Sequence, residues 1–244
     1  MTQPKVVILC GGRGERMGEM AAERPKPMVE VGGQPLLWHI MKHYERHGHR
    51  HFVLAVGRFG SLVQDYVNGL TNIGFVQGEN TGWTTQNGGR VKRLAPYLTE
   101  TFFLAWGDGV TDLDLGTMLS FHRSHGKLCT VATVQPPERF GGLEISWCNA
   151  PGYNFGPVRE FRERGRSDQW INAGIFVCEP GVLGYVEGDG TQWEQAPMHR
   201  LVEDGQLMAF AHDGFWQCMD TPRDRRVLEE LWASGNAPWK TWEG

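Results

Sequence analysis

The chain has 244 residues, with 24 Lys and Arg against 28 Asp and Glu, so its formal net charge is −4. A content of 40% hydrophobic and 21% charged residues is typical of a globular protein with a sizeable core. The slight acidity excludes a general nucleic-acid binder, which would carry a basic patch. The sequence contains no run of 18 apolar residues that could form a transmembrane helix, and the apolar run at 6–10 is too short for a signal peptide. We therefore expect no membrane and no nucleic acid as partner.

The cysteines are odd in number, widely spaced and without a CxxC pair. This pattern predicts reduced thiols in a cytoplasmic protein, most of them small core residues rather than catalytic groups. The five are Cys10, Cys129, Cys148, Cys178 and Cys218.

Short apolar runs alternate with longer amphipathic runs in the first 135 residues, which predicts a βαβα order. The predicted strands are 6–10, 52–56, 73–76, 102–106 and 128–134. The predicted helices are 35–47, 61–68, 90–98 and 115–125. Such an order favours an α/β fold, a mostly parallel mixed sheet flanked by helices.

After about residue 135 short strands dominate, and helices return near the end. We predict strands at 143–147, 156–162 and 171–178 and helices at 191–203 and 222–234. No low-complexity linker or internal repeat interrupts the chain. The sequence therefore predicts a single domain, 1–244, with a smaller strand-rich lobe.

A glycine-rich turn, GGRGERMG, follows the first predicted strand at 11–18. Glycines at the end of a buried strand let backbone N–H groups approach an anion, and open α/β sheets bind ligands at that edge. The turn is neither a P-loop nor a Rossmann fingerprint, because Met17 occupies the third glycine position. Two prolines then hold Lys26 on extended backbone. The alternative is a turn that only reverses the chain, but glycines beside the cations Arg16 and Lys26 favour a phosphate site.

The segment 9–17, LCGGRGERM, followed by PKPMV at 25–29, resembles the signature of the sugar-1-phosphate nucleotidylyltransferase family. Within it, the chain is most similar to the glucose-1-phosphate cytidylyltransferase branch. The resemblance implies a Rossmann-like nucleotidyltransferase core, with a nucleotide-binding half at about 1–135 and a sugar-binding half plus C-terminal helix at about 136–244. Further similar segments are 37–41, 88–93, 107–114, 139–141, 191–195, 214–217, 219–221 and 237–243.

The resemblance also implies a reaction. A sugar 1-phosphate, α-D-glucose 1-phosphate or a related one, attacks the α-phosphorus of CTP, and a CDP-sugar and pyrophosphate form with Mg²⁺. A phosphate monoester is already a competent nucleophile, so catalysis needs alignment and charge neutralisation rather than a general base. Arg16 and Mg²⁺ would serve the pyrophosphate, and Lys26 the α-phosphate or the attacking phosphate. The alternatives are the same chemistry with another nucleotide or phosphorylated acceptor, and a non-catalytic nucleotide-sugar sensor.

Two aspartates are candidate metal ligands. Asp108 follows the predicted strand 102–106 and so faces the same sheet edge as the glycine turn. Asp220 stands in the segment Met219-Asp220-Thr221. Carboxylate oxygens suit Mg²⁺, and the resemblance implies that both aspartates bind it and that Asp108 is catalytic. The alternatives are a turn-forming Asp-Gly and a helix cap at Asp220 or Thr221; capping and metal binding can coexist.

The remaining site residues come from the resemblance. Those expected at the nucleotide are Leu9, Gly11, Gly12, Gly14, Gly88, Gly89 and Arg90. Glycines let a base lie against the backbone, and the Arg90 guanidinium can donate to a cytosine carbonyl. Those expected at the sugar phosphate are Glu144, Arg164 and Asn172; the alternative is ordinary loop and strand polarity.

Several positions depart from the family pattern. Asn87 replaces an expected Thr, and Arg164-Gly165 replaces Lys-Pro. The segment between residues 68 and 86 is also shorter than in the cytidylyltransferase branch, with a strand-and-loop portion deleted. These departures leave room for another nucleotide or acceptor.

Histidines recur at i, i+4 on the predicted first helix, at 39, 43 and 47. Three histidines on one face rarely complete a tetrahedral zinc site, so we expect no zinc there. Trp239 and Trp242 predict packing either on a partner subunit or on the chain's own core. We expect a homo-oligomer.

Overall fold

The computed structural model describes residues 3–12, 23–71, 73–135, 142–145, 148–150, 153–155, 158–162 and 169–243. Three predicted site residues, Gly14, Arg16 and Arg164, lie outside these ranges. Glu144 lies in strand β9 (Gly142–Ile145), where only the backbone is described.

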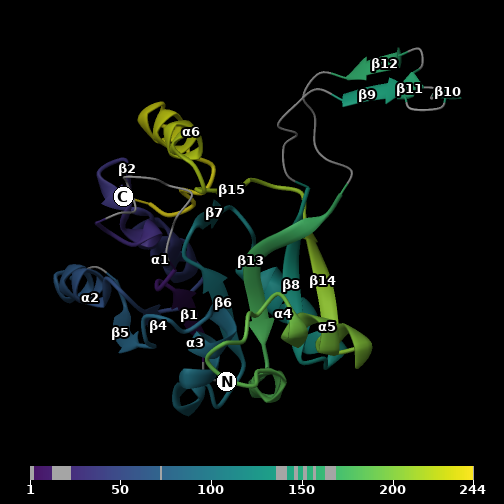
Figure 1. Cartoon of the computed structure of the whole chain (residues 1–244). Helices are drawn as coiled ribbons and strands as arrows, with labels where there is room; N and C mark the ends of the chain where they lie inside the picture. Colours follow the sequence, from purple (N-terminus) through teal and green to yellow (C-terminus); the bar gives the residue numbers. More distant parts are fainter. Residues whose placement is uncertain are drawn as a thin grey trace.

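A seven-stranded sheet forms the centre of the molecule, in the order β14-β8-β13-β6-β1-β4-β5 (Figure 1). Only β13 runs antiparallel to its neighbours, β6 and β8, and the other pairings are parallel. The predicted α/β fold with a mostly parallel mixed sheet is thus confirmed. The strands are β1 (Lys5–Leu9), β4 (His51–Val56), β5 (Phe75–Asn80), β6 (Phe102–Trp106), β8 (Cys129–Val134), β13 (Ile171–Cys178) and β14 (Leu207–His212).

Helices cover both faces of this sheet because its central strands are apolar on both sides. Along β1, Val6 and Ile8 join one apolar cluster and Val7 the other, as the two-residue period of a strand requires. Helices α1 (Leu36–Arg46), α2 (Gly60–Asn68), α4 (Leu115–His125) and α6 (Pro222–Ala233) contribute to the first cluster. Helices α3 (Asn87–Arg93) and α5 (Ala196–Glu203) contribute to the second.

Some predicted boundaries were wrong. The helix expected at 191–203 begins only at Ala196. Residues 191–195 instead bond with the start of α3, where the N–H of Gly89 donates to the carbonyl of Thr191. Strand β14 was not predicted because it is a half-buried edge strand, whose apolar residues show little contrast with their neighbours. The two-stranded ribbon of β7 (Gly109–Thr111) and β15 (Trp216–Cys218) was also missed, since three-residue strands carry no periodicity.

Small antiparallel pairs complete the fold. β9 pairs with β12 (Val158–Arg162), and β10 (Cys148–Ala150) pairs with β11 (Tyr153–Phe155). Both hairpins lie apart from the seven-stranded sheet in Figure 1. A third pair, β2 (Glu30–Val31) with β3 (Gln34–Pro35), precedes α1.

The C-terminal segment folds back onto the chain's own core. Trp239 and Trp242 are 1% and 7% exposed and belong to the same apolar cluster as α1. His39 on that helix contacts the Val31 carbonyl at 2.8 Å, and the Trp239 indole donates to His39 at 3.3 Å. Among the described residues no cluster of three His, Cys, Asp or Glu side chains could hold a metal, and no helix is long and apolar enough to cross a membrane.

Candidate active site

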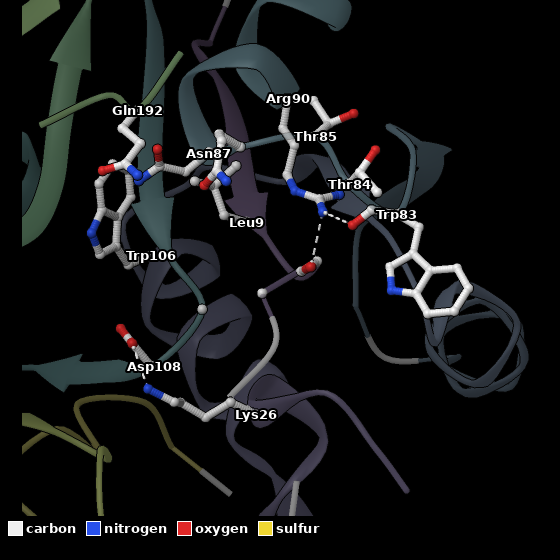
Figure 2. A pocket seen from close by; sticks show the side chains of 14 residues that line it. Leu9, Lys26, Trp83, Thr84, Thr85, Asn87, Arg90, Trp106, Asp108 and Gln192 are labelled. Carbon is white, nitrogen blue, oxygen red and sulfur yellow. Dashed lines mark hydrogen bonds and ion pairs between the residues drawn. The ribbon is translucent and has the colours of Figure 1, made fainter. Parts of the chain in front are cut away.

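A cavity of about 710 Å³ opens beyond the carboxyl ends of β1 and β6 (Figure 2). Six of the residues predicted to bind nucleotide or act in catalysis line it. They are Leu9, Gly11, Gly12, Lys26, Arg90 and Asp108. The strand-end position explains the assembly, because β1 lies between β4 and β6 and parallel strands deliver their carboxyl ends to one edge.

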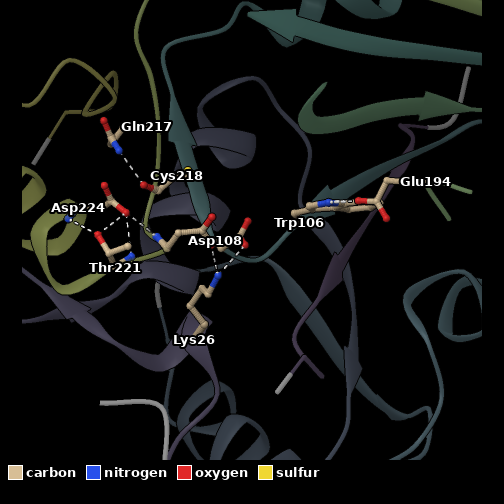
Figure 3. A network of polar contacts seen from close by, with 9 residues as sticks. Lys26, Trp106, Asp108, Glu194, Gln217, Cys218, Thr221 and Asp224 are labelled. Carbon is tan, nitrogen blue, oxygen red and sulfur yellow. Dashed lines mark hydrogen bonds and ion pairs between the residues drawn. The ribbon is translucent and has the colours of Figure 1, made fainter. Parts of the chain in front are cut away.

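Lys26 and the two candidate metal ligands meet at one end of this cavity. The Lys26 Nζ lies 3.1 Å from Asp108 Oδ2 and 2.5 Å from Asp220 Oδ1 (Figure 3 shows Lys26 and Asp108). All three side chains are mostly buried, at 12%, 28% and 15% exposure. Burial alone lowers the pKa of the Lys26 ammonium, but the two carboxylates together outweigh it and hold the pKa above its usual value. The lysine is therefore a fixed positive charge at neutral pH.

Local sequence determines where Lys26 stands. It begins a short 3-10 helix, Lys26–Met28, and the preceding Pro25 is extended at φ −71° and ψ 151°. At Gly107 a Cβ would come within 2.5 Å of the Leu9 carbonyl oxygen and of Pro27. The proline segment therefore packs directly against the ends of β1 and β6, and a side chain at residue 107 would push it away.

The β7–β15 ribbon brings the two aspartates together. Asp108 immediately precedes β7 and Asp220 is the second residue after β15, and Cys218 pairs with Gly109 in the antiparallel register. The N–H of Met219 donates to the Asp108 carbonyl at 2.7 Å. Antiparallel pairing places the start of one strand beside the end of the other, so this register makes the two carboxylates neighbours.

Asp112 secures the opposite end of the ribbon. Its Oδ1 accepts from the N–H of Phe215 at 2.7 Å and lies 3.0 Å from His212 Nε2. The Thr111 hydroxyl donates to the Phe215 carbonyl at 2.8 Å. These contacts hold the loop before β15, and thereby the register that positions Asp220.

A helix cap fixes the backbone at Asp220 itself. Thr221 is the N-cap of α6, with Pro222 in the first turn and a capping box with Asp224. The Asp224 Oδ2 accepts from the N–H of Asp220 at 3.0 Å and of Thr221 at 2.8 Å. Capping and the carboxylate site therefore coexist: Thr221 caps the helix, and the Asp220 side chain contacts Lys26.

The donor set suits a divalent cation. Asp108 and Asp220 direct carboxylate oxygens at the same ammonium, which stands in for a cation between them. Mg²⁺ prefers hard oxygen ligands, keeps several waters and bridges substrate phosphates, so two carboxylates beside an open cavity are a sufficient protein contribution.

Arg90 connects the glycine turn to the neighbouring strand. It is 4% exposed, and its Nη2 donates to the Gly11 carbonyl at 3.0 Å. Its Nη1 donates to the Val56 carbonyl at 3.2 Å and to the Thr81 hydroxyl at 2.7 Å. A Cβ at Gly11 would lie 2.3 Å from the guanidinium, so a side chain here would displace Arg90 from these acceptors. The described contacts thus make Arg90 a support of the turn.

Gly88 and Gly89 do not line the cavity. A Cβ at Gly88 would meet the Thr191 carbonyl oxygen at 2.7 Å, and one at Gly89 would meet the Asp189 backbone at 2.6 Å. Their lack of a side chain lets α3 pack against the 189–193 segment, which is a packing reason rather than close approach of a base.

Residues not predicted as site residues complete the cavity wall. The Trp106 indole donates to Glu194 at 2.9 Å, as Figure 3 shows, and Asn87 donates to the other oxygen of that carboxylate at 2.7 Å. Asn87 also accepts from the N–H of Trp193 at 2.8 Å. The sequence shows that these positions carry polar side chains. It does not show that β6, α3 and the segment 191–195 bring them together.

The predicted sugar-side residues are less fully described. Asn172 is exposed in β13, and its Oδ1 accepts from the N–H of Gly174 at 2.7 Å. It does not line the cavity. Gly174 adopts φ +75°, and a Cβ there would touch Trp106 at 3.0 Å, so glycine is required for Trp106 to pack across β13.

Known proteins are similar to this chain in sequence and in fold. The sequence profile of the family described as Nucleotidyl transferase matches residues 5–221. A glucose-1-phosphate cytidylyltransferase of Salmonella typhimurium is 42% identical, over 98% of this chain and all of that protein. A probable glucose-1-phosphate cytidylyltransferase of Bacillus subtilis is 35% identical over the same shares.

Solved structures agree on the fold. HddC from Yersinia pseudotuberculosis superposes with a TM-score of 0.71 at 21% identity, over 94% of this chain and 100% of that one. The inositol-1-phosphate CTP transferase from T. maritima gives a TM-score of 0.69 at 19% identity, over 98% of each chain. From the profile match and the full-length relatives, the chain belongs to the nucleotidyl transferase family.

Proposed function

We propose that the protein transfers a cytidylyl group from CTP to a sugar 1-phosphate, α-D-glucose 1-phosphate or a close relative, and releases pyrophosphate. The single observation that carries this proposal is the meeting of Lys26, Asp108 and Asp220 beside the glycine turn. The names of the relatives at 42% and 35% identity support the choice of CTP and glucose 1-phosphate.

In this reaction an oxygen of the sugar phosphate attacks the α-phosphorus of CTP, and the bond to the pyrophosphate oxygen breaks. The attacking phosphate and the triphosphate repel each other, so positive charge must lie between them. Lys26 is that charge: its ammonium is protonated, held by two carboxylates and exposed to the cavity. Arg16 would neutralise the leaving pyrophosphate, as the family pattern implies.

Asp108 and Asp220 would hold Mg²⁺, which would neutralise charge on the phosphates when bound. The chain's own residues position this pair, because Asp224 fixes the backbone at Asp220 and the ribbon register fixes it against Asp108.

The turn of Leu9, Gly11, Gly12 and Gly14, together with Arg90, would bind the nucleotide in the half at about 1–135. Four of these five residues line the cavity, which supports the assignment. Gly88 and Gly89 would act indirectly by setting the position of α3. Glu144, Arg164 and Asn172 would bind the sugar phosphate from the half at about 136–244.

A grid assay tests the function. Pyrophosphate release is measured with CTP, UTP, dTTP, ATP and GTP, each against glucose 1-phosphate and other phosphorylated acceptors in Mg²⁺. Turnover with CTP and glucose 1-phosphate alone is the expected result. If the protein binds an NTP but releases no pyrophosphate with any pair of substrates, the result would favour a nucleotide-sugar sensor.

A second candidate is the same chemistry with another nucleotide or acceptor. Asn87 favours it, because this departure from the family pattern takes part in a contact network that fixes the cavity wall at Trp106. Preferred turnover with another triphosphate or acceptor in the same grid would identify it.

We also propose a homo-oligomer. The edge strand β5 supports it, since Phe75 there is 64% exposed and an unpaired edge can accept a neighbouring chain. Light scattering at micromolar protein would show a multiple of 27.5 kDa, whereas the monomer mass would contradict the proposal.

A further inference from the structure

Trp83 is a large aromatic residue that the fold leaves in solvent. It is 64% exposed and lines the cavity near the glycine turn. A scattered exposed apolar residue needs no explanation, but an indole at the mouth of a polar cavity is a surface that a ligand can cover. The mechanism above does not use it.

The backbone around Trp83 is fixed although its side chain is exposed. The Trp83 carbonyl accepts from Arg90 Nη2 at 3.4 Å, and the same nitrogen donates to the Gly11 carbonyl. The preceding Gly82 adopts φ +88°, and its N–H donates to Asn80 at 3.0 Å. One guanidinium therefore ties the Trp83 backbone to Gly11, and Trp83 stands on the side of the cavity opposite Trp106 (Figure 2).

The Arg58 guanidinium makes a cation–π contact with the Trp83 ring. The guanidinium carbon lies 5.7 Å from the centre of the Trp83 ring and 4.8 Å from that of Phe59. Such a cation–π contact restricts the ring without enclosing it. Trp83 lines the cavity and is 64% exposed, so ring surface remains that a planar aromatic ligand can cover.

The other tryptophan of the cavity has a different place. The Trp106 indole is fastened to Glu194, and Trp106 stands two residues before Asp108, at the end of the cavity where Lys26 and the carboxylates meet. The Trp83 carbonyl instead accepts from Arg90, which also donates to the Gly11 carbonyl. The two tryptophans thus belong to different parts of the cavity, Trp106 beside the charged groups and Trp83 beside Arg90.

We propose that Trp83 is the stacking surface for the nucleobase and contributes to nucleotide affinity. This inference rests on the proposed function, in which the glycine turn and Arg90 face the nucleotide. Stacking of a base on an aromatic side chain is sequence-tolerant, because every base has a π face. Trp83 therefore strengthens binding of the nucleotide without selecting cytosine over uracil.

The test compares Trp83→Ala and Trp83→Phe with the wild-type protein by calorimetric titration of CTP and of pyrophosphate, a probe without a base. We expect Trp83→Ala to weaken CTP binding by about 5- to 150-fold and Trp83→Phe to fall between, with pyrophosphate affinity unchanged. In steady state the KM for CTP rises by a similar factor, and the KM for the acceptor does not. The matched control is Trp170→Ala, since Trp170 is 45% exposed but does not line the cavity.

Three results would each overturn the inference. The first is unchanged CTP affinity in Trp83→Ala, and the second is an equal loss of affinity for CTP and pyrophosphate. The third is a wild-type protein that binds CTP no more tightly than pyrophosphate. The proposed function fails in a separate way, when the wild-type protein binds CTP tightly but transfers no cytidylyl group. The binding titrations still decide the role of Trp83 in that case.

Discussion

Replacing Lys26 with methionine removes the ammonium that lies between Asp108 and Asp220. Methionine keeps the length and the apolar stem of the side chain but not the charge. The variant is expected to lose both stability and activity, and to depend more strongly on Mg²⁺ than the wild-type protein.

The distances set the size of the effect. At an effective dielectric constant of about 20, contacts of 2.5 and 3.1 Å correspond to roughly 5 to 7 kcal/mol of gross attraction each, most of which offsets desolvation. Removing the ammonium that these two mostly buried carboxylates share costs about 3 kcal/mol. Loss of a charge that stabilises a transition state reduces kcat by about 10²- to 10³-fold.

Urea denaturation in chelator and in millimolar Mg²⁺ measures the first effect, and pyrophosphate release the second. In chelator we expect the free energy of unfolding of Lys26→Met to be lower by about 3 kcal/mol. Adding Mg²⁺ should raise the free energy of unfolding of Lys26→Met more than that of the wild-type protein, because no ammonium competes for the carboxylates. The control variant Arg200→Met breaks an exposed ion pair with Glu187. Its change in the free energy of unfolding relative to wild type should be the same in chelator and in Mg²⁺.

An equal response of Lys26→Met and wild type to Mg²⁺ would refute the assignment of the carboxylate pair as the cation site. Wild-type turnover in Lys26→Met would refute the role of its charge in the reaction.

Three further predictions concern the supports of the site and the core. Arg90→Lys should lower the free energy of unfolding by about 2 kcal/mol and raise the KM for the nucleotide, because one ammonium cannot reach three acceptors; urea denaturation and kinetics check this. Thr221→Ala should cost about 1 kcal/mol in the same denaturation experiment, with kcat reduced less than by any change at Lys26, and no loss would contradict the cap. Burial, aided by neighbouring His47, lowers the pKa of His43 to about 3, so the unfolded chain takes up a proton below pH 6.5 that the folded chain does not. Stability should therefore fall by about 2 kcal/mol from this residue between pH 7 and pH 5, a loss that His43→Leu removes and a change of exposed His51 to Gln leaves in place.

Local pattern was sufficient where an element is determined by its own residues. The helix at 115–125 and the strands at 102–106 and 171–178 were predicted with the bounds that the structure has. A continuous apolar run or a complete amphipathic period specifies such elements without reference to distant contacts. The edge strand β14 and the ribbon of β7 and β15 exist only because they pair with other strands.

For the site, the strand-end rule located Gly11 and Asp108, because parallel strands present their carboxyl ends together. The same rule says nothing about Trp83, which follows an edge strand in a turn held by Arg90. The strand-end rule also does not say for what reason a glycine is required at a given position. Gly88 and Gly89 allow helix α3 to pack and do not line the cavity.

The sequence by itself determined the parallel core and the glycines at the end of β1, and it offered a helix cap at Asp220 or Thr221 as one interpretation, since each depends on neighbouring residues in the chain. Only the tertiary structure decided which charges meet. Lys26 and Asp220 are 194 residues apart, and their contact depends on the β7–β15 register and on the Asp112 contacts that hold its far end. Contact between such distant residues follows from strand pairing, whose register depends on several elements at once and is encoded in no single segment.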